Sequence, residues 1–283
     1  MPSLMISLLL SIFADTVCNA QVKFPPNAPM QTLRQEFGLG HIELIYTRPG
    51  ANKRRVFGDL VPYGKIWGTG EGAVTSIYFS TPVEVNTRRL DSGTYLLYTI
   101  PGEEQWEIIF NKGLDKKAGI EGYQERADVL RFKTEPVKTK IKTETFTIHL
   151  ADVQPERCEL QLVWEKRLIT IPIVTNVKDN LRRQLDAAMK GDKKPYWEAA
   201  RFYNEYEKNY NRALEMVNKA LELQPTAFWM FLYKAKIQQE TGNIAGATES
   251  ATNSLYLAKQ NGNADYIRMN EALLKALKKA AKK

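Results

Sequence analysis

The residue pattern of this chain changes abruptly after Val174, and this change limits the fold more than any other feature. Before it, short apolar runs such as residues 75–80 and 94–100 alternate with turns rich in Gly, Pro, Asn and Asp. After it, Ala, Leu, Glu, Lys and Asn dominate. The first pattern is typical of β-strands and the second of helices. The 283 residues are therefore predicted to form two domains, a β domain followed by an α domain.

Residues 28–174 are predicted to form an antiparallel β-sandwich of the jelly-roll kind. About eight or nine short strands with frequent turns and no intervening helical pattern favour that class. Residues 112–127 are expected to form a surface loop, and Pro172 predicts an edge strand for residues 169–173. Trp106 and Trp164 lie among apolar strand neighbours and are predicted to be core residues.

Residues 178–283 contain a repeat with a spacing of 34 residues. Trp197 recurs as Phe231, and Asn209 recurs as Asn243. Together with Pro225 at the end of the first unit, this spacing resembles the tetratricopeptide repeat, in which two helices pair. The second unit is degenerate because it lacks the expected alanine and proline. Residues 180–190 and 265–280 are predicted to be flanking helices, since two units alone bury little core.

The glycine-rich stretch of residues 54–72 is the strongest candidate for a binding site. Such a density of glycine indicates a constrained loop, and loops on β scaffolds often carry function. Aromatic rings beside polar groups suit sugars or peptide segments. The alternative is structural, with Trp67 closing one end of the sandwich and Arg48 donating to loop carbonyls. The candidate ligand-binding residues are Arg48, Tyr63, Trp67, Thr69 and Glu71.

The helical half carries more aromatic rings than two repeats need, and most should fill the interface between helices. The surplus predicts a surface that docks a protein segment. The candidate partner-binding residues are Tyr203, Asn204 and Tyr233.

Signals for catalysis are sparse. His41 and His149 are the two histidines, they lie far apart in the sequence, and no nucleophile elbow, phosphate loop or zinc-protease motif is present. The sequence therefore predicts a non-enzymatic protein without a metal or cofactor. The alternative is a hydrolase of glycans that uses carboxylates near the glycine-rich loop. Its candidate residues are Asp59, Glu71, Glu43 and Glu107.

Several ordered fragments of residues 28–173 resemble a bacterial family known as domain of unknown function 2911. They are residues 46–49 (YTRP), 55–67 (RVFGDLVPYGKIW), 93–95 (GTY), 99–102 (TIPG), Trp106 and residues 109–112 (IFNK). Family members typically continue after Trp67 with Arg-Thr-Gly-Ala-Asn-Glu, whereas this chain has Gly-Thr-Gly-Glu-Gly-Ala. The resemblance implies an exported β-rich domain, sometimes joined to helical repeats, and no established activity.

Residues 1–20 are predicted to be a signal peptide. An apolar run at residues 4–14 is followed by Cys18, Asn19 and Ala20, small residues suited to cleavage before Gln21. We therefore expect a periplasmic or secreted protein, and no other segment is long enough to span a membrane. Cys158 would then be an unpaired, buried residue. The net charge of +8 comes largely from a lysine-rich C-terminal helix, so nucleic acid is not an expected partner.

Overall fold

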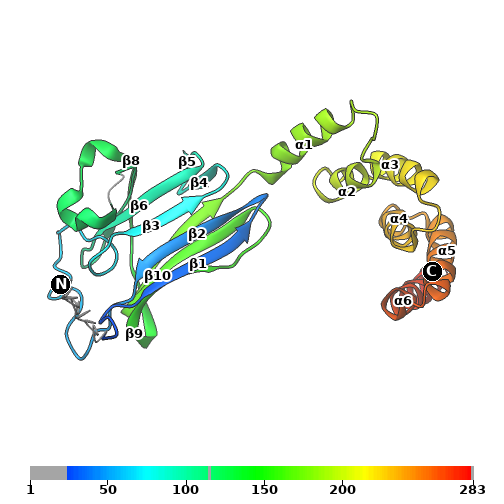
Figure 1. Ribbon diagram of the computed structural model, residues 1–283. Helices are drawn as coiled ribbons and strands as arrows, with labels where there is room; N and C mark the ends of the chain where they lie inside the picture. The colour runs from blue at the N-terminus through cyan, green and yellow to red at the C-terminus, as the bar shows by residue number, and fades with distance from the viewer. Residues whose placement is uncertain (1–23, 114–115, 282–283) are drawn as a thin grey trace, which may run out of the picture.

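The structure is a computed structural model that describes residues 24–113 and 116–281. Two antiparallel β-sheets form its first part, and six helices follow (Figure 1). We call these parts the β region and the helical region. The predicted signal peptide at residues 1–20 lies outside the described residues.

The larger sheet has six strands in the order β1-β2-β3-β6-β7-β8, with every neighbouring pair antiparallel. Alternating burial along β2 shows why these residues form a strand, because Ile42, Leu44 and Tyr46 face the core while their neighbours are more exposed. The strands are β1 (Met30–Phe37), β2 (Gly40–Thr47), β3 (Thr75–Phe79), β6 (Gly93–Ile100), β7 (Trp106–Asn111) and β8 (Asp128–Thr134).

The smaller sheet has four strands in the order β5-β4-β10-β9, also antiparallel. They are β4 (Val83–Val85), β5 (Arg88–Leu90), β9 (Val137–Ala151) and β10 (Arg157–Val174). One hydrophobic cluster takes inward residues from both sheets, including Trp106 and Trp164. The prediction that these two tryptophans are core residues is confirmed, since both are buried.

Strand β10 contains a bulge that changes which residues face inward. Its buried positions are even-numbered up to Trp164 and odd-numbered from Ile169 onward. Between them Glu165 has a φ of 48°, and the register with β9 shifts on both sides of it. At this bulge Val163 faces Thr147 while Arg167 faces Lys138, so the unmatched residues of the pairing lie on β9. The alternation of buried residues breaks at the bulge. The sequence therefore predicts a separate strand at residues 169–173, whereas the chain forms one long strand, β10.

Three further differences separate the structure from the sequence pattern. Strands β1 and β8 are not evident in the sequence, because their residues are largely polar and half-exposed. Residues 112–127 do not form a plain loop, since they include the 3-10 helices η1 (Lys116–Gly122) and η2 (Glu125–Ala127). Strand β10 lies between β4 and β9, so the edge-strand prediction for Pro172 is wrong for the sheet order, although Pro172 lies beyond the part paired with β9.

The helical region begins directly after β10. Asn209 and Asn243, 34 residues apart, cap α3 and α5 in the same way, each side chain accepting a backbone N–H three residues later. Helix α2 packs on α3, and α4 packs on α5. The helices are α1 (Val177–Ala188), α2 (Tyr196–Glu205), α3 (Tyr210–Leu223), α4 (Phe228–Glu240), α5 (Ile244–Gln260) and α6 (Ala264–Ala280).

The first turn of α1 is held by the β region. Glu156, in the turn between β9 and β10, accepts the backbone N–H groups of Val177 and Lys178 at 2.9 and 3.1 Å. A carboxylate at a helix N-terminus also suits the helix dipole. Among the described residues, no helix is both long and apolar enough to cross a membrane.

Candidate functional site

The glycine-rich stretch of residues 54–72 is fixed to the larger sheet. Trp67 and Thr99 exchange backbone hydrogen bonds of 2.8 and 2.9 Å, and the N–H of Gly64 donates to the carbonyl of Pro101. Gly58, with a φ of 92°, lies so close to the Tyr63 ring that a Cβ atom there would be 2.8 Å from Cε2. This glycine is therefore needed both for its backbone shape and for its small size. The loop is a rigid part of the β region.

Trp67 is half-buried at the centre of an aromatic cluster. Its ring is stacked with that of Trp164 at a centroid distance of 5.9 Å and lies 5.0 Å from that of Phe146. Its Nε1 donates to the carbonyl of Gly70 at 2.7 Å, which fixes the orientation of the indole. A ring held on one side by stacking and at its edge by a hydrogen bond has a defined position before any ligand arrives.

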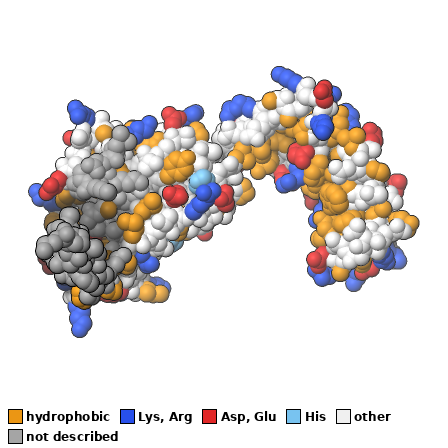
Figure 2. All heavy atoms as spheres, viewed as in Figure 1, with side chains coloured by type: hydrophobic (Ala, Val, Ile, Leu, Met, Phe, Trp, Pro, Cys, Tyr) orange, Lys and Arg blue, Asp and Glu red, His pale blue; other side chains and the backbone are white. Residues whose placement is uncertain are grey.

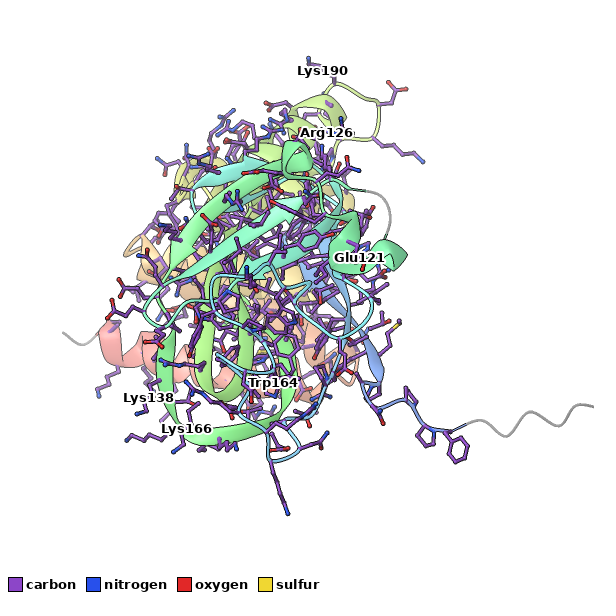
Figure 3. The ribbon with its side chains drawn as sticks, turned by 90° about the vertical axis from the view of Figure 1, so that its left-hand side faces the viewer. Glu121, Arg126, Lys138, Trp164, Lys166 and Lys190 are labelled. Carbon is purple, nitrogen blue, oxygen red and sulfur yellow. The ribbon has the colours of Figure 1, made fainter. Side chains whose placement is uncertain are left out.

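A cavity of about 480 Å³ lies between this loop and η1. Indole and aliphatic groups form most of its lining, and the acidic groups are Glu71 and Glu121. In Figure 3, Glu121 lies on η1 at the right-hand side, and Trp164 lies lower, toward the bottom of the β region. The lining residues are Pro49, Leu60, Val61, Trp67, Gly68, Gly70, Glu71, Gly72, Ala73, Val74, Gly119, Ile120, Glu121 and Trp164.

The candidate ligand-binding residues separate into two groups. Trp67 and Glu71 line the cavity. Thr69 is fully buried with a φ of 54°, and its carbonyl accepts the hydroxyl of Thr75, so it supports the loop. Tyr63 packs against the core, and Arg48 donates to the carbonyl of Phe146 and the hydroxyl of Thr147 at 3.3 and 3.0 Å. Arg48 therefore has a structural role, but its partners lie on β9 and are not the loop carbonyls predicted from the sequence.

Most of the lining residues are not among the sequence-based candidates, and Trp164, Ile120 and Glu121 come from outside the glycine-rich stretch altogether. Trp164 has the sequence pattern of a core residue and is buried, yet it also lines the cavity just before the register with β9 shifts. Ile120 and Glu121 come from the segment expected to be a loop. No signal in the sequence singles out Ile120, because isolated hydrophobic residues are common on protein surfaces and this one is 50% exposed.

The carboxylates of the hydrolase alternative do not gather in one place. Glu107 pairs with Arg131 at 3.3 Å on the larger sheet, and neither Asp59 nor Glu43 lines the cavity. Glu71 does line it, together with Glu121. Within the described residues, no group of three or more His, Cys, Asp and Glu side chains has the arrangement of a metal site.

The candidate partner-binding residues of the helical region form contacts within the helical region itself. The Nδ2 of Asn204 donates to the Tyr233 hydroxyl at 2.9 Å, and that hydroxyl donates to Glu205 at 3.0 Å. Burial, with the nearby Glu205 carboxylate, raises the pKa of Tyr233 to about 12. Tyr203 is 8% exposed beneath the guanidinium of Arg212, 4.5 Å from its ring. These residues join α2, α3 and α4, and they present little surface.

Comparison with known families decides the relationship of the β region. A family model described as protein of unknown function (DUF2911) matches residues 28–173, which is more than half of the chain. The chain belongs to this family. The match covers both β-sheets and the cavity-lining loop, and it stops before α1. No curated protein matches the chain.

Proposed function

We propose that this DUF2911-family chain is an exported binding or assembly protein without enzymatic activity. Its two sheets would form a jelly-roll-like sandwich that holds a ligand, and its helices would dock a protein segment. The observation that carries the proposal is the cavity whose wall includes Trp67 and Trp164 and whose acidic groups are Glu71 and Glu121. The core common to both sheets supports the sandwich.

A neutral sugar or a peptide segment fits the chemistry of this cavity. Indole surface favours the apolar faces of sugar rings and peptide side chains, while the carboxylates of Glu71 and Glu121 accept hydrogen bonds from hydroxyl or amide groups. Lys and Arg are missing from the described lining residues, so an anionic ligand would face two carboxylates without a compensating charge. We therefore place neutral glycans first.

Titration of the chain with neutral oligosaccharides, followed by tryptophan fluorescence and calorimetry, tests this site. We expect Ile120→Ala and the double variant Glu71→Gln/Glu121→Gln each to weaken binding about tenfold or more, since each removes contacts inside the cavity. Glu43→Gln is the matched control, because Glu43 lies on β2 outside the cavity lining. Equal affinity in all variants would place the ligand elsewhere.

The helical region fits a tetratricopeptide-like array that binds an extended protein segment. The support is the pairing of α2 with α3 and of α4 with α5, with capping asparagines 34 residues apart. Hydrophobic side chains lie among charged ones on this region (Figure 2). Because Tyr203 is buried, we assign the docking role to the exposed rings of Trp229 on α4 and Tyr256 on α5, in addition to Asn204 and Tyr233.

A peptide-display screen against the whole chain tests the docking role. Selected peptides should bind the parent chain and lose affinity in Trp229→Ala and Tyr256→Ala, whereas Phe24→Ala, which alters an exposed ring of the β region, should leave binding unchanged. Peptides that bind all four chains equally would argue against docking on the helices.

Export is tested by cell fractionation and N-terminal sequencing of the mature protein. We expect the chain in the periplasmic or secreted fraction, beginning at Gln21. Recovery in the cytoplasm with residues 1–20 intact would contradict this part of the proposal.

The glycan hydrolase remains a second candidate because Glu71 and Glu121 line one cavity. Paired carboxylates across a sugar site are the machinery of glycoside hydrolysis. If this reading holds, the parent chain releases reducing ends from an oligosaccharide that it binds, and either Glu71→Gln or Glu121→Gln abolishes that release. Binding without turnover would leave the non-enzymatic proposal in place.

A further inference from the structure

One end of the β region carries a concentration of positive charge that the proposed ligand site does not use. We call residues 137–142 of β9, together with Lys166 and Arg167 of β10, the basic tip. Lys138 and Lys166 lie at the lower end of the β region in Figure 3. The cations of the basic tip are Lys138, Lys140, Lys142, Lys166 and Arg167, and the nearest carboxylates in sequence are Glu135, Glu144 and Glu165.

Pairing within the chain leaves most of this charge uncompensated. Lys142 lies 3.8 Å from Glu165, and no other cation of the basic tip has a carboxylate within ion-pair distance among the described residues. Moreover, Lys138 and Arg167 stand directly opposite each other in the ladder of β9 and β10. Like charges at facing positions destabilise a sheet, so this arrangement favours an anionic partner.

The basic tip also exposes two aliphatic side chains. Ile141 is 80% exposed and Val137 is 57% exposed, and both lie on the same strand as the three lysines. The bulge opposite Glu165 sets the intervening residues of β9 outside the regular ladder. Lysines on an edge strand such as β9 also prevent sheets from pairing edge to edge, but that role gives no reason for the isoleucine and valine.

We propose that the basic tip binds an anionic lipid surface. Cationic side chains gain energy from the negative potential of such a surface, and the exposed aliphatic side chains of the same tip can enter the boundary of the acyl region. A soluble polyanion would use the lysines but would have no need of Ile141 and Val137. The exposed aliphatic groups therefore favour a membrane surface over a polysaccharide or nucleic acid.

Flotation of the whole chain with vesicles tests the proposal. We expect binding to phosphatidylcholine vesicles that contain phosphatidylglycerol, and none to phosphatidylcholine alone. Each lysine-to-glutamine change at Lys138, Lys140 or Lys166 should lower partitioning about fivefold. Ile141→Ser should lower it about tenfold without altering the net charge. These side chains are exposed or lie at the strand surface, so unchanged thermal unfolding would show that the variants still fold.

The control removes the same charge elsewhere. Lys275→Gln/Lys278→Gln, on α6, should leave vesicle binding unchanged if the basic tip is the contact. Loss of partitioning to the same degree in this control would show a non-specific charge effect and overturn the proposal. So would binding to heparin that equals or exceeds vesicle binding and is insensitive to Ile141→Ser, since that result identifies a polyanion site. Absence of any vesicle binding also overturns it. None of these outcomes depends on the proposed sugar site.

Discussion

The β region and the helical region have cores made of different types of side chain. In the β region, the main cluster of large rings and aliphatic side chains joins both sheets, with Trp164 near several other aromatic rings. A smaller cluster lies around Tyr98 and Ile109. In the helical region the buried residues divide into two clusters, and the second brings helices together through Ala235, Ala247 and Ala251. Where large rings fill a core, loss of a single ring removes much of the packing free energy. Where small residues let helix backbones lie close together, a larger side chain forces the helices apart. The two regions should therefore fail under opposite kinds of substitution.

The largest effect is expected from removal of a ring in the β region. Trp164→Ala deletes a fully buried side chain that stacks on Trp67 and donates to the carbonyl of Glu144 at 3.0 Å. We expect a loss of about 3–5 kcal/mol in the free energy of unfolding, measured by urea denaturation. A loss below about 1 kcal/mol would show that the core around Trp164 can collapse into the space, which would contradict the ring-based core described for the β region.

The opposite substitution should be the damaging one in the helical region. Ala251 is fully buried where α5 meets its neighbours, so Ala251→Leu overfills the contact. The expected loss is about 1–3 kcal/mol by the same measurement. Ala245→Leu, on the exposed side of the same helix, is the matched control and should change stability by less than about 0.5 kcal/mol. Equal effects at the two sites would remove the distinction between the two cores.

The stability of the chain should fall at alkaline pH because of Tyr233 in the helical region. Burial raises the pKa of Tyr233 from 10.0 to about 12 in the folded chain. The unfolded chain therefore loses this proton first, and stability falls as the pH rises above 10. Between pH 9 and pH 11 the parent chain should lose about 1.4 kcal/mol more than Tyr233→Phe. Equal pH dependence in urea denaturation of the two chains would contradict the raised pKa.

The smallest expected loss of stability comes from removing the N-cap of α3 or of α5, and it allows the two helix pairs to be compared. Asn209→Ala and Asn243→Ala each remove one N-cap hydrogen bond, of 3.2 Å to Arg212 and 2.9 Å to Gly246 respectively. We expect each to cost about 1 kcal/mol, because the two caps have the same geometry. Thermal unfolding followed by circular dichroism gives the comparison. A difference of more than about 1 kcal/mol between them would show that the two pairs are not equivalent.

Local patterns in the sequence account for more of the helical region than of the candidate site. The positions of the α3 and α5 caps follow from Asn209 and Asn243 at a fixed spacing, and helix contacts are largely local in sequence. The cavity instead combines a loop at residues 67–74 with η1 and with Trp164, which are far apart in the chain. The alternation of apolar and polar residues marks Trp164 as buried, but it does not show that the pairing of β10 with β9 shifts immediately afterwards.

Polar residues were the least predictable in both regions. Arg48 is a charged residue near the predicted ligand-binding loop, and Tyr203 is an aromatic residue in the predicted partner-binding helices. Both are therefore candidates on the sequence alone. The structure gives Arg48 partners on β9 and covers Tyr203 with Arg212. A single sequence carries no direct signal for such long-range pairing, whereas Trp67 and Glu71 follow from their place in a constrained, glycine-rich loop.

The bulge in β10 has a consequence for how the length of this chain can vary. A one-residue deletion inside a regular strand reverses the facing of everything beyond it and is usually excluded. Between Trp164 and Ile169, however, deletion of one residue would leave a regular alternation, with Trp164 and Ile169 still directed inward. This short interval is thus a point where related chains can gain or lose a residue while the core survives. What would change is the pairing with β9 beyond Trp164, where the register is already irregular.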